Sequence, residues 1–348
     1  MGFKIVFKKE EEKLFLRYWQ EIIDKAKVSS KYLPLNLETN LALSKDRSLL
    51  IRDKSFIYAR NDQPVAGVFL PIEENDGYFT ITITNYYVDA PILIDRLVEG
   101  KIFSIIDEIA KENNVAKIMF SADPLDRAID YNYLQKYDYL DTSILNYVID
   151  LQIKNLFVAL RRNHQRNIKR ILQDQDFSVF AINQDTSSYE KHEEFRELHH
   201  KCAGRVTAPK EVFDLQFEKL KQGQAVLFGL KYKGKNIAYM YFDYAHNNAV
   251  SYQAADDPEY DKLPLYHVLT FTAMEYLQKH GIKYIDTGQP SGISHQIGYY
   301  PDQKQLNIGL FKYGFGGDFR NLFRGVKYFS KTLFAEDMGE FVDSYKTQ

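Results

Sequence analysis

The stretch that decides the fold is NAVSYQAADDPEYDKLPLYHVLTFTAMEYLQKHGIKYIDTG, residues 248–288. Its first part, residues 248–255, is rich in β-favouring side chains, and turn-forming residues follow as far as Pro264. Residues 265–280 then carry apolar side chains at helical spacing, and residues 283–286 form a second short apolar run. This pattern predicts a strand, a turn, a helix and a second strand.

A unit of this kind makes its two strands parallel, because the crossover helix must pack back on the sheet. Ligands of open α/β sheets bind at the carboxyl ends of such strands. We therefore expect residues 255–266 and 286–291 to border a site.

The elements around this unit recur in the first half of the chain. Two strands and a turn precede it, at residues 225–231 and 237–244. The first half has the same order of hairpin, strand, helix and strand, at residues 54–59, 65–72, 78–86, 101–112 and 116–121. The repeated order predicts an α/β protein with two copies of one domain, each a mixed β-sheet flanked by helices. We place the domains at residues 1–150 and 151–348, and a final helix at residues 321–334.

Composition limits the classes of function. The net charge of −2 gives no overall attraction to nucleic acid or anionic membrane, so a polyanion would need a local basic patch. The single cysteine, Cys202, excludes an internal disulfide and suits a reducing compartment. No apolar run approaches the roughly 20 residues of a membrane helix, so we expect a cytoplasmic protein without membrane insertion.

One basic patch is present in LFVALRRNHQRNIKRIL, residues 156–172, which has the pattern of an amphipathic helix. Arg162 and Arg166 lie on its charged side, and His164 lies on its apolar stripe. A solvated helix face explains the charges as well as a phosphate-binding surface does. We interpret His164 as a packed histidine rather than a base.

Five features together resemble the Fem-type tandem-GNAT acyltransferases. They are the Arg-rich helix, the strand ending in Gln-Ala-Ala-Asp at 253–256, the helix that closes on Gly281, the strand ending in Asp-Thr-Gly at 286–288, and Phe-Lys-Tyr-Gly-Phe-Gly-Gly at 311–317. The family includes aminoacyl-tRNA-dependent peptidoglycan ligases and acyl-CoA-dependent relatives. The resemblance is firmest over residues 156–320, a little under half of the chain.

The resemblance implies a GNAT-like fold for each half, with the donor in the second. Residues 307–312 have the pattern of a strand with Ile308, Leu310 and Lys312 on one face. Phe311 and Lys312 match the family's F-K-x-G-F segment, which lies on a late strand, and its lysine contacts the acceptor phosphate or the reacting carbonyl. Arg205 matches an arginine that contacts the acceptor in some members. The predicted donor-binding residues are Arg162, Arg166, Lys262, Leu265 and Tyr266. The predicted acceptor-binding residues are Arg205, Phe311 and Gln289.

The sequence departs from the GNAT pattern in one respect. The usual Q/R-x-x-G-x-G/A segment places glycines where backbone N–H groups approach a pyrophosphate. Residues 257–266 contain no glycine. A helix N-terminus near Pro264 still offers an anion site. The chain also lacks the long charged helical hairpin that resembles a tRNA-binding arm in some Fem ligases.

N-acyl transfer needs a base for the amine and a proton source for the leaving group. Asp256 ends a strand at the predicted site and is a candidate base, whereas Asp257 suits a turn. Tyr299 is a candidate proton donor, and His295 is a candidate base or acceptor ligand. His199, His200 and Cys202 provide too few ligands for a structural zinc, so we expect no metal.

We expect acyl transfer from acyl-CoA, with acetyl-CoA as the favoured donor, to an amino group. The expected acceptor is a small molecule, an amino sugar or a nucleotide-linked sugar for a surface glycan. Two alternatives remain. One is an aminoacyl-tRNA-dependent ligase for a peptidoglycan precursor, with tRNA less favoured as a partner. The other is a GNAT pair that only binds its ligand, as the missing glycines suggest.

Overall fold

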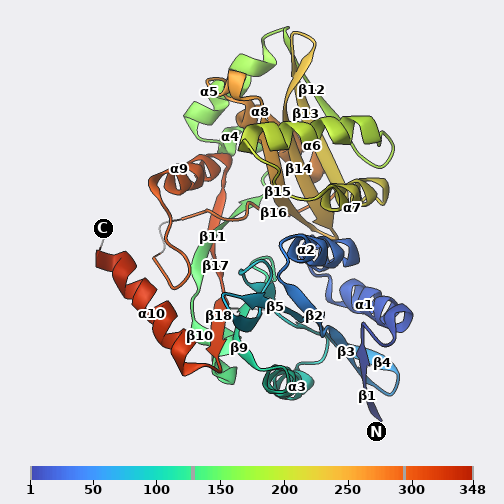
Figure 1. The fold of residues 1–348 in the computed structure, drawn as a ribbon. Coiled ribbons are helices and arrows are strands. Elements are labelled where there is room, and N and C mark those ends of the chain that lie inside the picture. The colour runs from blue at the N-terminus through green and yellow to red at the C-terminus, as the bar shows by residue number, and fades with distance from the viewer. Residues whose placement is uncertain (1, 127–129, 293–294, 347–348) are drawn as a thin grey trace. The chain divides into compact units, whose positions relative to one another are not determined.

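The computed structural model describes residues 2–126, 130–292 and 295–346 (Figure 1). The chain divides into two compact units. The first unit contains Met1–Leu145, Ile293–Asp302 and Asn321–Gln348, and the second contains Asn146–Gly292 and Gln303–Arg320. The predicted division at residue 150 had placed both late segments of the first unit in the second half.

The helices and strands of the two units are as follows. The first unit has β1 (Phe3–Phe7), α1 (Glu12–Ala26), α2 (Pro34–Asp46), β2 (Leu50–Asp53), β3 (Phe56–Arg60), β4 (Gln63–Val68), β5 (Pro71–Asn75), β6 (Tyr78–Ile81), β7 (Val88–Asp89), β8 (Ile92–Leu93), α3 (Glu99–Glu112), β9 (Val115–Ser121), β10 (Leu140–Asp141), β18 (Arg324–Tyr328) and α10 (Lys331–Lys346). The second unit has β11 (Ile144–Asp150), α4 (Leu156–Ala159), α5 (Arg162–Leu172), β12 (Phe177–Ile182), α6 (Tyr189–Ala203), α7 (Lys210–Lys221), β13 (Ala225–Tyr232), β14 (Lys235–Ala245), β15 (Asn248–Asp256), α8 (Leu265–Lys279), β16 (Tyr284–Asp286), α9 (Gln303–Lys312) and β17 (Gly317–Leu322).

The second unit is built on one seven-stranded sheet with the order β12-β13-β14-β15-β16-β11-β17. The predicted strand–helix–strand unit is confirmed, because β15 and β16 are parallel and α8 connects them. Alternation along β14 directs Met240 and Phe242 into the core with α8. Tyr239 and Tyr241 point to the other face and pack against Phe195 of α6. Helices α6 and α8 therefore cover opposite faces of the sheet (Figure 1).

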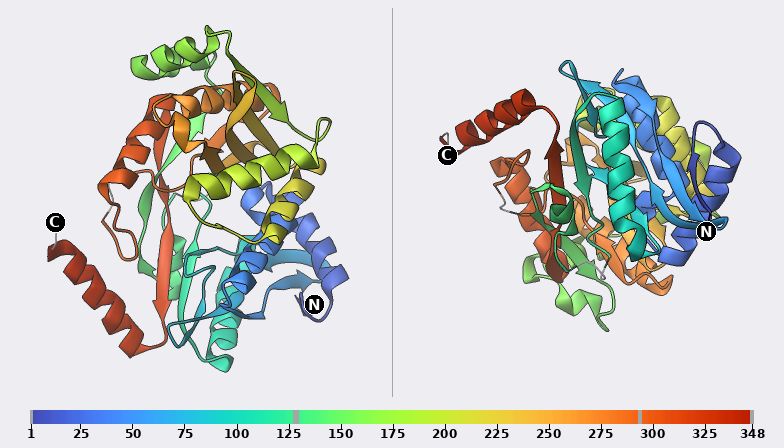
Figure 2. Two further views of the ribbon diagram at one scale, coloured as in Figure 1. Left: turned by 45° about the horizontal axis from the view of Figure 1, so that its top comes forward. Right: turned by 90° about the horizontal axis from the view of Figure 1, so that it is seen from below.

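The first unit has two sheets, β1-β3-β4-β8 and β10-β18-β9-β6-β5-β2. Helix α1 covers the smaller sheet, where Trp19 and Ile22 lie against Gly67 of β4. On the larger sheet, Phe120 of β9 packs against Phe103 of α3. Lys117, on the opposite face of β9, forms an ion pair with Asp337 of α10. Helices α3 and α10 therefore lie on opposite sides of this sheet (Figure 2).

The order of strand pairing recurs between the units, and the predicted tandem GNAT-like fold of mixed sheets flanked by helices is confirmed. In the second unit the order is β13-β14-β15-β16-β11-β17. In the first unit β3 pairs with β4, β5 pairs with β6, and β9, β18 and β10 follow. The difference is a break between β4 and β5 at Phe69 and Leu70, which divides one strand between two sheets.

Two strands belong to sheets in which their position in the sequence would not place them. Strand β11, from the end of the predicted first domain, lies between β16 and β17 of the second unit, and β18 lies between β9 and β10 of the first. The predicted final helix at 321–334 is therefore wrong at its start. Arg324, Val326 and Tyr328 alternate with smaller or polar residues. This segment forms a strand rather than a helix because the edge of β9 is available for pairing. Helix α10 begins only at Lys331.

The predicted single helix over residues 156–172 is also wrong. It is two helices, because Leu160 and Arg161 are extended, with ψ near 148° and 140°. The backbone N–H of Arg161 donates to the carbonyl of Gly314 at 2.9 Å. A tertiary hydrogen bond therefore replaces the helical one at this point.

Gly317 provides a test of the contact between β11 and β17. A Cβ atom at Gly317 would lie 2.2 Å from the carbonyl oxygen of Val148, which is backbone and has no other rotamer to adopt. We expect Gly317→Ala to lower the free energy of unfolding by about 1–3 kcal/mol, the usual cost of overpacking. Denaturant unfolding of the purified chain measures this change.

Gly339 is the matched control, because a Cβ atom there meets nothing within 4 Å and the residue lies inside α10. Gly339→Ala should leave the free energy of unfolding unchanged or raise it by up to about 1 kcal/mol. Equal effects of the two substitutions would show that β17 is not held against β11 at Gly317.

Candidate active site

The site in the second unit begins where β15 and β16 separate. The two strands pair only through Asn248–Val250 and Tyr284–Asp286. Strand β15 continues for six more residues, to Asp256, and pairs there with β14 alone. One backbone edge of β15 is thus left without a strand partner among the described residues.

Strand β16 ends at Asp286, whose side chain binds a backbone N–H group of the turn that follows. Its Oδ1 atom accepts hydrogen bonds from Nδ2 of Asn146 at 2.7 Å and from the backbone N–H of Gly288 at 2.8 Å. Gly288 has a φ of 65°, a left-handed conformation that glycine adopts without strain. The chain therefore turns away from β15 two residues after the last strand pair.

A pocket of about 750 Å³ occupies the region beside this free edge. It is lined by residues of β15, of the first turn of α8 and of one face of α9. The lining side chains are Met240, Ser251, Tyr252, Gln253, Ala254, Leu263, Pro264, Leu265, Tyr266, His267, Thr287, Lys304, Asn307, Ile308, Phe311 and Lys312. This set contains two lysines and no carboxylate, so the pocket favours an anionic or neutral ligand.

The turn that leads into α8 is held by Asp257, as the sequence predicted. Its side chain accepts the backbone N–H of Glu259 and pairs with Lys201 at 2.7 Å and Lys235 at 2.9 Å. Burial favours the protonated carboxyl, but hydrogen bonds from the two lysines overcome this effect and lower the pKa of Asp257 to about 2. Asp257 is therefore a charged structural anchor.

Helix α8 presents its N-terminus to the pocket through Leu265 and Tyr266. No acidic residue lies in its first turn. The first N–H groups of a helix lack helical partners and carry a partial positive charge. This end of α8 can therefore receive an anion without competition from a nearby carboxylate of the same turn.

Asp256, the predicted base, is connected to the pocket by Tyr266. The Tyr266 hydroxyl donates to Oδ1 of Asp256 at 2.7 Å, and Sγ of Cys202 lies 3.4 Å from the same oxygen. Burial and the neighbouring carboxylate raise the pKa of Tyr266 well above its usual value, so its hydroxyl keeps its proton. Asp256 is not itself among the lining residues.

Two neutral histidines support the wall of the pocket. His164 is buried, and its Nε2 atom lies 2.9 Å from the carbonyl of Phe311, so it is packed as predicted. His267 lies edge-on to His164, and its Nε2 accepts a hydrogen bond from Asn167. Burial, together with the neighbouring His164, lowers the pKa of His267 to about 4. Sequence reasoning missed His267, which follows Tyr266 directly in the chain.

Lys312 lies at the end of α9, so the predicted strand at residues 307–312 is wrong. The segment reads equally well with periods of two and of 3.6, and the helix is favoured because Ile308, Phe311 and Lys312 then share one face that lines the pocket. Gly309 allows this arrangement. A Cβ atom there would lie 3.3 Å from the backbone of Ser291.

The ammonium of Lys312 is held by backbone carbonyls rather than by a carboxylate. Nζ donates to the carbonyl oxygens of Gly288 and Pro290, each at 2.8 Å. Burial lowers the pKa of Lys312 to about 8, and the charge of Asp286 opposes part of this decrease. The lysine thus ties α9 to the turn after β16 while it lines the pocket.

The other predicted ligand residues differ in position. Phe311, Leu265 and Tyr266 line the pocket. Gln289 donates to Oδ1 of Asn146 at 3.2 Å, next to the turn that Lys312 holds. The remaining ones are exposed and outside the lining set, namely Arg162, Arg166, Lys262 and Arg205. Their predicted roles stay predictions.

His295 and Tyr299 belong to the first unit. Nε2 of His295 lies 2.8 Å from the hydroxyl of Ser344 in α10, and its ring packs edge-on against Tyr345. The ring of Tyr299 lies 5.8 Å from the guanidinium of Arg324. Neither lines the pocket described above.

Comparisons with known proteins bear on the fold. Residues 159–300 match the family model described as an acetyltransferase (GNAT) domain. The chain has a tandem GNAT-like fold and is similar over most of its length to three solved structures. These are FemX (13% identity, 85% of this chain and 92% of that chain, TM-score 0.60), L-PGS from Bacillus licheniformis (14%, 88% and 96%, 0.57) and a tandem GNAT protein from the clavulanic acid biosynthesis pathway (12%, 94% and 98%, 0.51). The search of curated proteins found no match.

The residues that the structure describes contain neither a metal cluster nor a membrane-spanning helix. No group of three or more His, Cys, Asp or Glu side chains in this part of the chain is placed to hold a metal ion. His199 instead contacts the hydroxyl of Thr207 at 2.8 Å. Within the same residues, no helix is long and apolar enough to cross a membrane.

Lys312→Met tests the structural contribution of the lysine. The substitution leaves two inward-facing carbonyls without their charged donor, so we expect the free energy of unfolding to fall by about 1–3 kcal/mol. Lys304→Met is the control on the same helix, because Lys304 lines the pocket but is exposed. It should change stability by less than about 0.5 kcal/mol. Equal stabilities of the two variants would mean that the carbonyl contacts of Lys312 contribute nothing.

Proposed function

We propose that this chain transfers an acyl group from acyl-CoA, bound in the pocket of the second unit, to an amino group of an amino sugar or of a nucleotide-linked sugar used in a cell-surface glycan. The observation that carries the proposal is the opening between β15 and β16. It places a free strand edge, a helix N-terminus and a lysine around one pocket.

A difference in strand pairing between the two units supports the second unit as the one that binds the donor. Strands β6 and β9 occupy the places of β15 and β16, and they also separate after a short parallel pairing, at Ile81. There, however, β7 fills the opening, because Val88 and Asp89 pair with Phe120 and Ser121 of β9. No strand among the described residues fills the corresponding opening in the second unit.

The residues of the pocket fit an acyl-CoA. The unpaired edge of Ser251–Asp256 offers backbone N–H and C=O groups to the amide-containing arm of the donor. The N-terminus of α8 suits phosphate although residues 257–266 lack glycine. The lining side chains are mostly apolar and include Ile308 and Phe311, which suits an acyl chain.

In the proposed reaction, the neutral amine attacks the thioester carbonyl. A C–N bond forms, the C–S bond breaks, and the CoA thiolate leaves and takes a proton from solvent. The amine proton passes to Asp256 through the hydroxyl of Tyr266, which already donates to that carboxylate. The ammonium of Lys312 stabilises the negative charge that develops on the carbonyl oxygen.

The alternative reaction uses an aminoacyl-tRNA as donor. One observation favours it, because Arg162, Arg166, Lys169 and Arg170 are all exposed on α5. Such a surface suits a phosphate backbone. Saturable binding of an aminoacyl-tRNA that is lost in the Arg162→Ala, Arg166→Ala double variant, without binding of acetyl-CoA, would replace our proposal with this one.

Incubation with acetyl-CoA and either glucosamine or a nucleotide-linked amino sugar tests the reaction. We expect release of the CoA thiol together with an N-acetylated product in the mass spectrum. Binding of acetyl-CoA without product from any amine would instead favour a protein that only binds its ligand.

A substitution that fills the pocket should block the donor. Ile308→Trp places a larger side chain on the face of α9 that lines the pocket, and we expect at least tenfold weaker binding of acetyl-CoA by calorimetric titration. Leu310→Trp is the control, because Leu310 is 50% exposed on the same helix and lies outside the lining set. Unchanged affinity of the Ile308 variant would exclude this pocket as the donor site.

The role proposed for Lys312 predicts a pH dependence. The ammonium is the active form and its pKa is about 8, so its contribution should decrease as the pH rises through that value. The ratio of kcat/KM between the native chain and Lys312→Met cancels the ionisation of the acceptor amine. We expect a ratio of roughly 10² near pH 7 that declines above pH 8. A ratio that stays constant to pH 9.5 would mean that the charge does not act in catalysis.

A further inference from the structure

The first unit contains a second cavity, of about 710 Å³, between its larger sheet and α10. Its floor is formed by side chains of β9 and β18, and its walls include Tyr78, Tyr86, Tyr87 and Tyr300. The function proposed for the second unit makes no use of it. We ask which ligand its side chains would bind.

The pairing of β18 with β9 shows which side chains form the floor of the cavity. Tyr328 lies opposite Lys117, and Val326 lies opposite Met119, and all four side chains line the cavity. The register has no shift, so the next pair on this face is Arg324 with Ser121. The side chain of Arg324 therefore extends from the same face of the sheet, at the end of the cavity floor.

Arg324 is buried, with 5% of its surface exposed, and is only partly satisfied. Its Nε donates to the carbonyl of Thr142 at 2.9 Å, and its guanidinium lies 4.2 Å from the ring centre of Tyr87, a cavity residue. Its Nη2 atom is buried and has no hydrogen-bond partner among the described residues. Within the same residues it forms no ion pair with a carboxylate.

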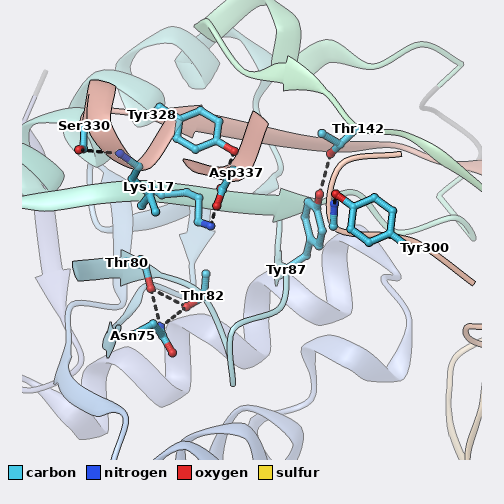
Figure 3. Close-up of polar contacts among 12 residues, drawn as sticks. Asn75, Thr80, Thr82, Tyr87, Lys117, Thr142, Tyr300, Tyr328, Ser330 and Asp337 are labelled. Carbon is cyan, nitrogen blue, oxygen red and sulfur yellow. Dashed lines mark hydrogen bonds and ion pairs between the residues drawn. The ribbon is translucent and has the colours of Figure 1, made fainter. Parts of the chain in front are cut away.

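The carboxylates that line the cavity are Asp76, Glu336, Asp337 and Glu340, and none of them forms an ion pair with Arg324 among the described residues. Asp337 accepts from Lys117 at 2.8 Å and from the hydroxyl of Tyr328 at 2.7 Å (Figure 3). Tyr87 is likewise fixed, by a hydrogen bond of 2.8 Å with Thr142 (Figure 3). A buried guanidinium without an anion costs free energy, and so does each unmade hydrogen bond. A bound anion would remove both costs.

We propose that this cavity binds a sugar-sized small molecule that carries a phosphate or carboxylate group, and that Arg324 holds the anionic group. The tyrosine rings offer flat apolar surfaces to the C–H face of a sugar ring. Polar residues at the rim, including Asn75, Asp76 and Asn85, match the hydroxyl groups of such a ligand. The volume suits a molecule of this size rather than an inorganic ion.

Calorimetric titration of the full chain with glucose 1-phosphate, glucuronate and glucose tests the proposal. We expect saturable binding of at least one of the two anionic sugars and at least tenfold weaker binding of glucose. Preference for glucose 1-phosphate would identify phosphate as the anionic group, and preference for glucuronate would identify carboxylate. Absence of binding by both anionic sugars at millimolar concentration, or equal binding of glucose, would overturn the proposal.

Arg324→Gln should weaken binding of the preferred anionic sugar by roughly ten- to a hundredfold, since a charge-assisted hydrogen bond is lost. Arg60→Gln is the matched control, because Arg60 pairs with Asp95 at 2.8 Å outside the cavity. If Arg324→Gln does not fold, Tyr300→Ala removes a cavity wall at a half-buried position and should also weaken binding at least tenfold. Native affinity in a folded Arg324 or Tyr300 variant would place the ligand elsewhere.

Discussion

The candidate active site depends on the early end of β16. Three residue pairs hold β15 and β16 together, and then the carboxylate of Asp286 captures the N–H of Gly288 and turns the chain aside. The same turn exposes the carbonyls of Gly288 and Pro290, which Lys312 binds. One side chain thus ends a strand, frees the edge of its neighbour and creates the place where the lysine of α9 is held.

The two units show how one pairing order gives two kinds of cavity. In the second unit the opening between the central parallel strands remains, and the pocket beside it has no carboxylate in its lining. In the first unit β7 closes the corresponding opening. The cavity there lies instead on the face of the sheet under α10, and charged and aromatic side chains line it. Sheets with the same pairing order therefore carry cavities of different chemistry in different positions.

The sequence predicted the elements whose periodicity is unambiguous. Residues 265–280 have helical spacing over four turns and are confirmed as α8, and the strands before and after them are confirmed as well. Short apolar runs are ambiguous. Residues 307–312 suit a strand or a helix, and only contacts with Ser291 and the pocket select the helix. The segment before α10 forms β18 because β9 supplies its partner, which no local pattern reveals. Arg324 was missed for the same reason.

Strand β11 comes from the first half of the sequence but lies in the sheet of the second unit, and β18 comes from the second half but lies in a sheet of the first. This arrangement affects how the chain can fold during synthesis. The larger sheet of the first unit lacks the strand beside β9 until residues 324–328 have left the ribosome. Until then β9 has an unpaired edge, and β10 has no neighbour in the sheet. A unit whose sequence is mostly made first is therefore completed last, and its pairing joins residues about 200 positions apart, a slow type of contact to form.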